Sequence, residues 1–201
     1  MNSRLIMTVV MMAVVVAVSF SHAADPTAKP QSKQDLMMEA MLKFGPPGPE
    51  HKNLEPLVGT WTAKMKMWMD PSQPAIESDG MLTRKAVLGG RFVQEDYTGN
   101  VMGQSYQGVG TMGFDRAKKT YLSNWMDNMS TAVMDSKGQY DEAAKTWTFG
   151  CEETCPLTNE PVKSRHTLQI VNSNEQKMTM YRKTGNEPEM KCMELLLTRK
   201  Q

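Results

Sequence analysis

Hydrophobic and polar residues alternate along most of the chain after residue 60. The first run places Trp61, Ala63, Met65, Met67 and Met69 on one side, with polar residues such as Thr62 and Lys64 between them. A period of two is typical of a strand with one buried face. Similar runs follow at roughly 76–87, 91–98, 105–114, 119–127, 132–140, 145–151, 162–171, 176–183 and 189–199.

Turn residues separate these runs at short, regular intervals, which favours an all-β fold. We expect a single closed antiparallel up-and-down β-barrel of about ten strands. Closure would remove the exposed edges of a long antiparallel sheet. One hairpin also resembles the next, because the segment 114–121 is echoed by 140–147, with an aromatic residue, an Asp and a second aromatic residue in the same order.

Short helices are predicted ahead of the barrel. Ser32 and Asp35 form an N-capping pattern, and Met37, Met41 and Phe44 then recur on one helical face. The sequence Gly-Pro-Pro-Gly-Pro ends this helix. Residues 51–57 fit one or two further turns.

The N-terminus has the three regions of a secretory signal peptide. Arg4 supplies the positive charge, Leu5–Val18 is apolar, and Ser21-His22-Ala23 is a cleavage signal. The apolar run is shorter than the roughly 20 residues of a membrane-spanning helix. We therefore predict cleavage after Ala23 and a secreted or periplasmic protein. The expected organisation is a signal peptide at 1–23, a flexible segment with a short helix at 24–49, and the barrel domain at 50–201.

Charge argues against a nucleic-acid partner. The chain has 23 Lys and Arg residues against 22 Asp and Glu residues, and removal of the leader with Arg4 makes the numbers equal. Nucleic-acid binding depends on clustered basic residues that neutralise phosphates, and this sequence has no basic run. No second apolar run predicts a membrane span after processing.

Three cysteines lie in the predicted barrel: Cys151, Cys155 and Cys192. Disulfides persist in the compartments that secreted proteins reach. A local bridge between Cys151 and Cys155 would leave Cys192 unpaired, and a bridge from Cys155 to Cys192 is the alternative. Spacing alone does not decide the connectivity.

A set of short motifs carries a family resemblance. They are His51-Lys52, Leu57–Trp61, Leu88–Phe92, Glu95, Tyr97, Gly108, Gly110, Gly113–Asp115, Met193-Glu194 and Thr198–Lys200. Together they resemble a bacterial secreted family, domain of unknown function 1579, over about residues 50–200. The family is similar in architecture to the calycins and lipocalins.

The resemblance implies a calycin-like barrel and no established activity, so no catalytic residue carries over. It also implies a structural role for two residues. Trp61 on the first strand and Arg199 near the end of the last would stack by a cation–π contact, as in the lipocalins that they resemble. This contact would join the two ends of the sheet.

A barrel of this size can bind a ligand inside, with a few polar groups setting its orientation. His166 shares a strand face with Ser164 and Leu168 and is the first candidate anchor, although a hydrogen-bonded structural histidine is the alternative. Arg91, on the predicted strand that carries Glu95, is the second; the two could also pair with each other. The predicted wall residues are Met65, Met67, Val93, Trp125, Leu168 and Met180.

We therefore expect a barrel that binds a small apolar or amphipathic molecule, whose identity and any cofactor stay open. The 16 methionines that follow the leader suggest an alternative, a Cu(I)-linked stress or carrier protein, because thioether sulfur is a soft ligand. Methionine is also an adaptable core residue. Cys151, Cys155 and His166 would make only an incomplete zinc site, so no metal site is predicted.

No catalytic motif of the common hydrolase, metalloprotease or phosphate-binding kinds occurs, and we expect no enzyme. A minor hypothesis is an isomerase that works inside the barrel with Asp127, Glu194 and His166. A third possibility is an interaction module that binds nothing in its interior.

Overall fold

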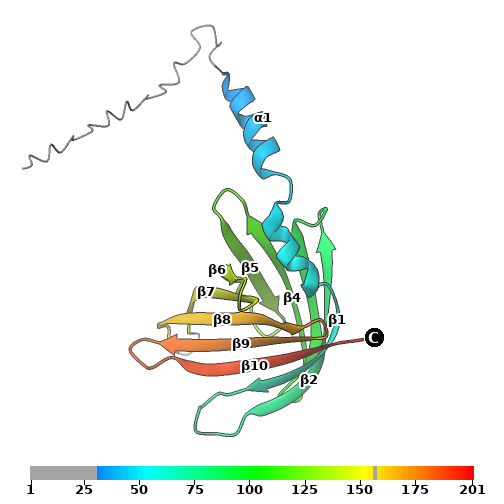
Figure 1. The fold of residues 1–201 in the computed structure, drawn as a ribbon. Helices are drawn as coiled ribbons and strands as arrows, with labels where there is room; N and C mark the ends of the chain where they lie inside the picture. The colour runs from blue at the N-terminus through cyan, green and yellow to red at the C-terminus, as the bar shows by residue number, and fades with distance from the viewer. Residues whose placement is uncertain (1–30, 156–157) are drawn as a thin grey trace, which may run out of the picture. The chain divides into compact units, whose positions relative to one another are not determined.

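Ten antiparallel strands close into one barrel in the computed structural model, which describes residues 31–155 and 158–201 (Figure 1). Each strand pairs with the next along the chain, and β1 also pairs with β10. The up-and-down barrel predicted from the sequence is confirmed. The strands are β1 (Gly59–Met67), β2 (Ile76–Val87), β3 (Phe92–Val101), β4 (Gln104–Asp115), β5 (Thr120–Asp127), β6 (Met134–Asp141), β7 (Thr146–Thr154), β8 (Pro161–Asn172), β9 (Glu175–Thr184) and β10 (Met190–Arg199).

Side chains alternate between the barrel interior and its outer surface. In β1, Trp61, Ala63 and Met65 are buried while Thr62 and Lys64 are exposed. This alternation is the sequence pattern that predicted the strand.

The expectation that Met69 continues the inward row is wrong. The strand ends at Met67, the backbone N–H of Trp68 donates to the Cys192 carbonyl, and Met69 lies in the following loop, 72% exposed.

Two hairpin turns are built in the same way, as their sequence similarity suggested. The Asp115 carboxylate accepts hydrogen bonds from the backbone of Ala117 and Lys118 at 3.0 Å. The Asp141 carboxylate accepts one from the backbone of Ala144 at 3.0 Å. An aspartate at the start of the turn stabilises the chain reversal in both hairpins.

Two helices precede the barrel: α1 (Lys33–Phe44) and the 3-10 helix η1 (Pro49–Leu57). Ser32 and Asp35 cap the start of α1 through reciprocal hydrogen bonds. No residue of α1 is buried. The chain divides into two compact units between Met38 and Glu39, and the second contains η1 and the whole barrel.

The predicted signal peptide and residues 24–30 of the segment expected to follow it lie outside the described residues. Among residues 31–155 and 158–201, no helix has both the length and the apolar character needed to cross a membrane.

The helix η1 lies against β3 and β4 at one end of the barrel, here called the η1 end (Figure 1). Its Leu54 and Leu57 are fully buried and join an interior cluster that includes Val93, Trp147 and Phe149. Burial of one leucine side chain contributes roughly 1.5–3 kcal/mol. The η1 end of the barrel is therefore plugged by packed side chains.

Cys151 and Cys192 form no disulfide, so neither of the two bridges considered from the sequence is present. Strand β7 runs on to Thr154, beyond the end predicted at residue 151. Four residues of extended chain separate Cα atoms by about 13 Å, whereas a disulfide requires less than about 7 Å. The local bridge between Cys151 and Cys155 is therefore excluded by the strand itself.

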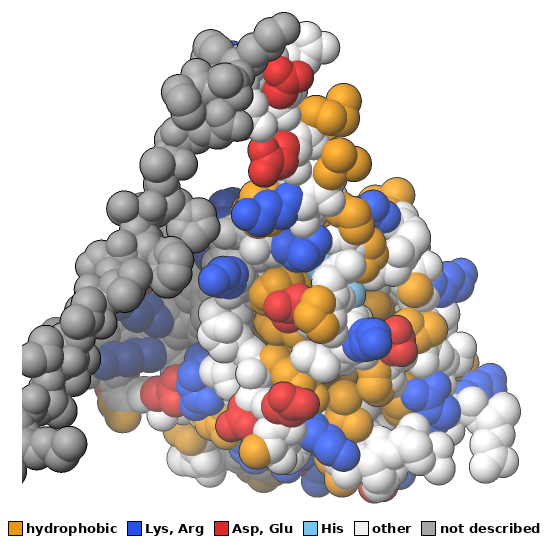
Figure 2. Space-filling view, turned by 45° about the horizontal axis from the view of Figure 1, so that its top comes forward, with side chains coloured by type: hydrophobic (Ala, Val, Ile, Leu, Met, Phe, Trp, Pro, Cys, Tyr) orange, Lys and Arg blue, Asp and Glu red, His pale blue; other side chains and the backbone are white. Residues whose placement is uncertain are grey.

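Charged side chains of both signs are interspersed over the face seen in Figure 2. Several acidic and basic residues pair on the outer surface, for example Lys66 with Glu77 at 2.9 Å and Arg165 with Glu189 at 2.7 Å. Exposed pairs of this kind contribute little to stability. They keep the outer face of the strands polar.

Candidate functional site

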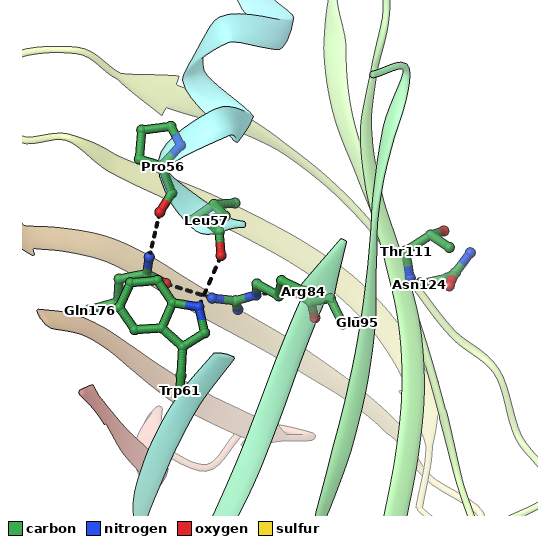
Figure 3. Close-up of polar contacts among 8 residues, drawn as sticks. All are labelled: Pro56, Leu57, Trp61, Arg84, Glu95, Thr111, Asn124 and Gln176. Atoms are coloured by element: carbon green, nitrogen blue, oxygen red, sulfur yellow. Dashed lines mark hydrogen bonds and ion pairs between the residues drawn. The ribbon is translucent and has the colours of Figure 1, made fainter. Parts of the chain in front are cut away.

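Trp61 and Arg199 are register partners where the first and last strands meet. The guanidinium carbon of Arg199 lies 4.1 Å from the centre of the Trp61 ring. The indole N–H donates to the Leu57 carbonyl at 3.0 Å (Figure 3). Arg199 also donates to the carbonyls of Pro56, Val58 and Ser173 at 2.9–3.1 Å. These contacts tie β1, β10 and the end of η1 together.

A buried polar network lies just inside this seam (Figure 3). The Nε of Arg84 donates to a Glu95 carboxylate oxygen at 2.6 Å, and its Nη1 donates to the Gln176 side-chain carbonyl. The Gln176 amide in turn donates to the Pro56 carbonyl at 3.1 Å. Three strands and η1 are thereby joined through groups that point into the barrel.

Sequence reasoning missed Arg84 and Gln176. Arg84 sits between Thr83 and Lys85 in a polar stretch that reads as an outer surface. The one available signal was Leu82, which shares its strand face with Arg84 and is buried. Gln176 lies 92 residues from Arg84 in the chain, and only barrel closure brings the two side chains together.

Three aromatic residues line the interior toward the end opposite η1. The phenol of Tyr106 donates to the Asp127 carboxylate at 3.0 Å and accepts the Trp125 indole N–H at 3.1 Å. Tyr97 packs edge-on against Tyr106, with ring centroids 5.7 Å apart. Burial raises the pKa of Tyr106, so this phenol stays protonated at all physiological pH values.

A glycine gives the Trp125 ring its place against the wall. A Cβ atom at Gly108 would lie 2.1 Å from the Trp125 ring. The absence of a side chain at residue 108 therefore lets the indole lie close to strand β4. A ring held against the wall leaves more of the interior free than one that points across it.

His166 on β8 points inward and is 5% exposed. Its ring stacks on Phe149, with centroids 4.9 Å apart. Burial lowers the pKa of His166 to about 4, an effect that the nearby Glu95 carboxylate partly opposes. The imidazole is therefore neutral at physiological pH and retains an unprotonated nitrogen.

Several inward-facing polar atoms are buried and have no hydrogen-bond partner in the described part of the chain. They include His166 Nδ1, Tyr97 Oη and Ser136 Oγ. An unsatisfied buried polar group costs roughly 1–3 kcal/mol. Native proteins rarely leave buried polar groups unpaired unless water or a ligand satisfies them.

Some inward-facing side chains away from η1 are only half-buried, although others there, such as Tyr97 and Val162, are buried. Glu95, Trp125, Met67, Met180 and Met193 all face the interior and keep some contact with solvent. Solvent therefore reaches part of each of these side chains. We use the name lumen for this interior region.

The predicted wall residues divide between the lumen and the packed core. Met67, Trp125 and Met180 face the lumen and are half-buried. Val93 and Leu168 belong to the packed cluster under η1, and Met65 belongs to a second buried cluster that includes Trp61.

The expectation that Arg91 anchors a ligand inside the barrel is wrong. Arg91 lies before β3, in a turn where Gly89 and Gly90 have positive φ values. Its guanidinium donates to the carbonyls of Gly45 and Leu88, at the outer edge of the barrel. Glu95 pairs with Arg84 instead.

The structure also separates the residues of the isomerase hypothesis. Glu194 lies on the outer face of β10 and forms ion pairs with Lys177 and Lys191 at 3.0 and 3.3 Å. Asp127 is engaged by Tyr106 inside the barrel. The three proposed catalytic residues therefore do not share one site.

A groove of about 850 Å³ runs between η1 and the β2–β3 turn. Two of its polar side chains already have partners: His51 Nδ1 accepts the Gly48 backbone N–H at 3.0 Å, and Arg116 donates to the Pro46 carbonyl at 3.0 Å. None of the buried unpaired polar atoms found in the described residues belongs to a residue that lines this groove, so the lumen is the stronger candidate site.

Cys151 and Cys192 have weakly reactive thiols. Burial raises the pKa of the Cys151 thiol and that of the Cys192 thiol. Both thiols are therefore protonated at neutral pH, and a thiol in that state is a weak nucleophile.

Residues 46–199 match the family described as "Protein of unknown function (DUF1579)". The chain belongs to this family. No curated protein matches it. Among solved structures, it is similar to Rv2717c from M. tuberculosis, with a TM-score of 0.59 and 13% sequence identity over 77% of this chain and 99% of that one. At this identity the likeness shows a shared fold, and it says nothing about a shared ligand.

Proposed function

We propose that this DUF1579 protein binds a small amphipathic molecule in the lumen of its barrel. The observation that carries the proposal is the set of buried, unpaired polar atoms that face a region lined by half-buried side chains. Tyr97, Ser136 and His166 supply hydrogen-bonding atoms. Trp125 and Met180 supply apolar surface beside them. A ligand with an apolar body and one or two polar groups matches such a wall.

The polar atoms also suggest what the ligand offers. The Tyr97 and Ser136 hydroxyls can donate or accept a hydrogen bond. A neutral imidazole donates a hydrogen bond from one ring nitrogen and accepts one at the other. Arg84 is already committed to Glu95 and Gln176, so it is not free to bind a carboxylate. We therefore favour an uncharged polar group, such as a hydroxyl or a carbonyl, over an acid.

The test is native mass spectrometry of the protein purified gently from its own host, with organic extraction to identify bound molecules. We expect a fraction of the protein to carry a bound small molecule. Met180→Trp should reduce this fraction, because an indole would fill the lumen. Met126→Trp is the matched control, since Met126 lies on the outer face of β5 and is 41% exposed. Loss of the adduct in both variants, or no adduct in any sample, would reject the proposal.

We propose binding rather than catalysis. Support comes from the dispersal of Asp127, Glu194 and His166 and from the raised pKa values of the buried thiols. The molecule recovered from the lumen provides the check. Chemical conversion of that molecule during incubation with purified protein would contradict this part of the proposal.

We also propose that the protein acts outside the cytoplasm, in the periplasm or beyond it. The support is the three-part leader in the sequence, which ends at Ala23. Intact mass measurement of the protein from a periplasmic extract should give a chain that begins at Ala24. A full-length chain confined to the cytoplasm would contradict the assignment.

A further inference from the structure

Four side chains form one row across neighbouring strands inside the barrel. Met67 on β1 is the register partner of Met193 on β10, and Met193 is the partner of Met180 on β9. Met180 is in turn the partner of His166 on β8. The row therefore presents three thioethers and one imidazole on consecutive strands of the inner wall, and the two thioethers nearest to His166 are those of Met180 and Met193.

Register fixes how near these groups are to one another. Directly opposed residues on antiparallel strands have Cβ atoms about 4.5–5.5 Å apart. Because the wall of a barrel curves, side chains that point inward from adjacent strands converge toward its axis. Methionine has three rotatable bonds and can direct its sulfur toward a common point.

We propose that Met180, Met193 and His166 form a binding site for a single Cu(I) ion. Thioether sulfur selects soft cations, and imidazole also suits copper. Two of the three ligands are uncharged thioethers, so the site matches a singly charged soft ion better than Zn²⁺ or Mg²⁺, which bind thiolate, imidazole or oxygen sites. The inference goes beyond the organic ligand proposed above and does not depend on it.

The state of His166 agrees with this role. Its Nδ1 atom is buried and has no hydrogen-bond partner in the described part of the chain. The ring is held by stacking on Phe149, which limits its rotation. An oriented imidazole next to thioethers is ready to bind a soft cation.

Packing alone does not account for the whole row. Met67 and Met193 pack against the buried cluster that contains Trp61, although both are only half-buried. Met180 is also half-buried, and it belongs to neither of the two packed clusters. A buried imidazole nitrogen that stays unpaired in the same row would destabilise the fold.

Cysteine thiols bind Cu(I) strongly and would obscure the measurement. The experiment therefore uses the purified protein with Cys151→Ser, Cys155→Ser and Cys192→Ser. Cu(I) is titrated under reducing, oxygen-free conditions against bicinchoninate as the competing chelator. Urea unfolding of each variant checks that it is folded, and a Met→Leu exchange conserves volume well enough for this to be expected.

We expect one Cu(I) per chain in the cysteine-free protein. Met180→Leu, Met193→Leu and His166→Phe should each weaken Cu(I) binding at least tenfold. Met81→Leu and Met126→Leu, which replace exposed methionines on the outer face of β2 and β5, should leave the affinity unchanged. X-ray absorption of the complex should show both sulfur and nitrogen neighbours around copper.

Three results would overturn the inference: loss of Cu(I) binding on removal of the cysteines, equal affinities in the lumen and outer-face variants, or an absorption spectrum without sulfur ligands. A protein that retains an organic molecule by native mass spectrometry but binds no Cu(I) would remove this inference alone. The proposed function would then stand.

Discussion

Arg84 and Glu95 form an ion pair inside the barrel, with 2.6 Å between Nε and Oε1. The Arg84 side chain is 2% exposed and that of Glu95 is 14% exposed. Removing two charges from water is costly, and the pair is tolerated because Gln176 also accepts a hydrogen bond from Arg84. The Gln176 amide carries the network on to η1.

Breaking this pair should destabilise the barrel strongly. Arg84→Met leaves the Glu95 carboxylate facing the lumen without its partner, and we expect a loss of about 3–5 kcal/mol in the free energy of unfolding. The double variant Arg84→Met with Glu95→Leu should be less destabilised than Arg84→Met alone, because no unpaired charge remains. Urea denaturation followed by circular dichroism measures both. Additive losses in the double variant would contradict the role given to the pair.

The contrast between Arg84 and Arg91 shows what the sequence pattern could predict. Strand β2 was placed at its observed bounds, and the first and last strands were joined correctly, because long alternating runs define strands well. Arg91 was predicted to be the first residue of a strand that begins one residue later, at Phe92, in the structure. Arg84 lies among polar residues, so the sequence pattern did not indicate that its side chain points inward. Its partner Gln176 lies far away in the chain. The local sequence pattern therefore predicted the strands, whereas the polar network could be recognised only in the closed barrel.

Arg199 should matter to stability more than its neighbour in sequence. Arg199→Ala removes the stacking on Trp61 and hydrogen bonds to three backbone carbonyls, so we expect a loss of roughly 2–3 kcal/mol. Lys200→Ala is the control, because Lys200 is exposed, and it should change stability by less than about 0.5 kcal/mol. Thermal unfolding of the two variants gives the comparison. Similar melting temperatures would show that the seam does not hold the barrel closed.

His166 should make the protein less stable in acid. Its pKa is about 4 in the folded protein and 6.5 as its ordinary value, so the unfolded chain binds more protons between these pH values. Stability therefore falls as the pH drops from about 6.5 toward 4, and the loss by pH 4.5 is about 2–3 kcal/mol from this residue. Unfolding free energies at pH 7 and pH 4.5 measure it.

His166→Phe supplies the control for this pH effect. Burial also lowers the pKa of His51, so part of the acid sensitivity will remain in the variant. The difference between wild type and variant isolates the contribution of His166. A pH dependence that is the same in both proteins would show that His166 is solvated and titrates normally.

Gly108 should not tolerate a side chain. Gly108→Val places its Cβ atom within contact distance of the Trp125 ring, and we expect a loss of about 1–3 kcal/mol and a shift in tryptophan fluorescence. Gly150→Val on β7 is the matched control, because the nearest atom to an added Cβ there is 4.0 Å away. Equal effects of the two substitutions would show that Trp125 does not rest on strand β4.

The cysteines show a second limit of sequence reasoning. A short spacing in a chain with a predicted signal peptide made a local bridge one of two alternatives, and the strand end, which lies three residues later than predicted, rules that bridge out. The ends of a strand are set by its hydrogen bonds to neighbouring strands. The hydrophobic pattern of one strand alone is therefore a poor predictor of where it ends. The inward direction of Cys151 follows from the same alternation that placed His166 correctly.

A crystal structure of the protein purified directly from its host, without refolding, tests the lumen site most directly. We predict electron density for a small molecule beside Trp125 and Met180, with a polar atom within hydrogen-bond distance of Tyr97, Ser136 or His166. A lumen that contains only ordered water, even in crystals soaked with millimolar amphipathic ligands, would contradict the account.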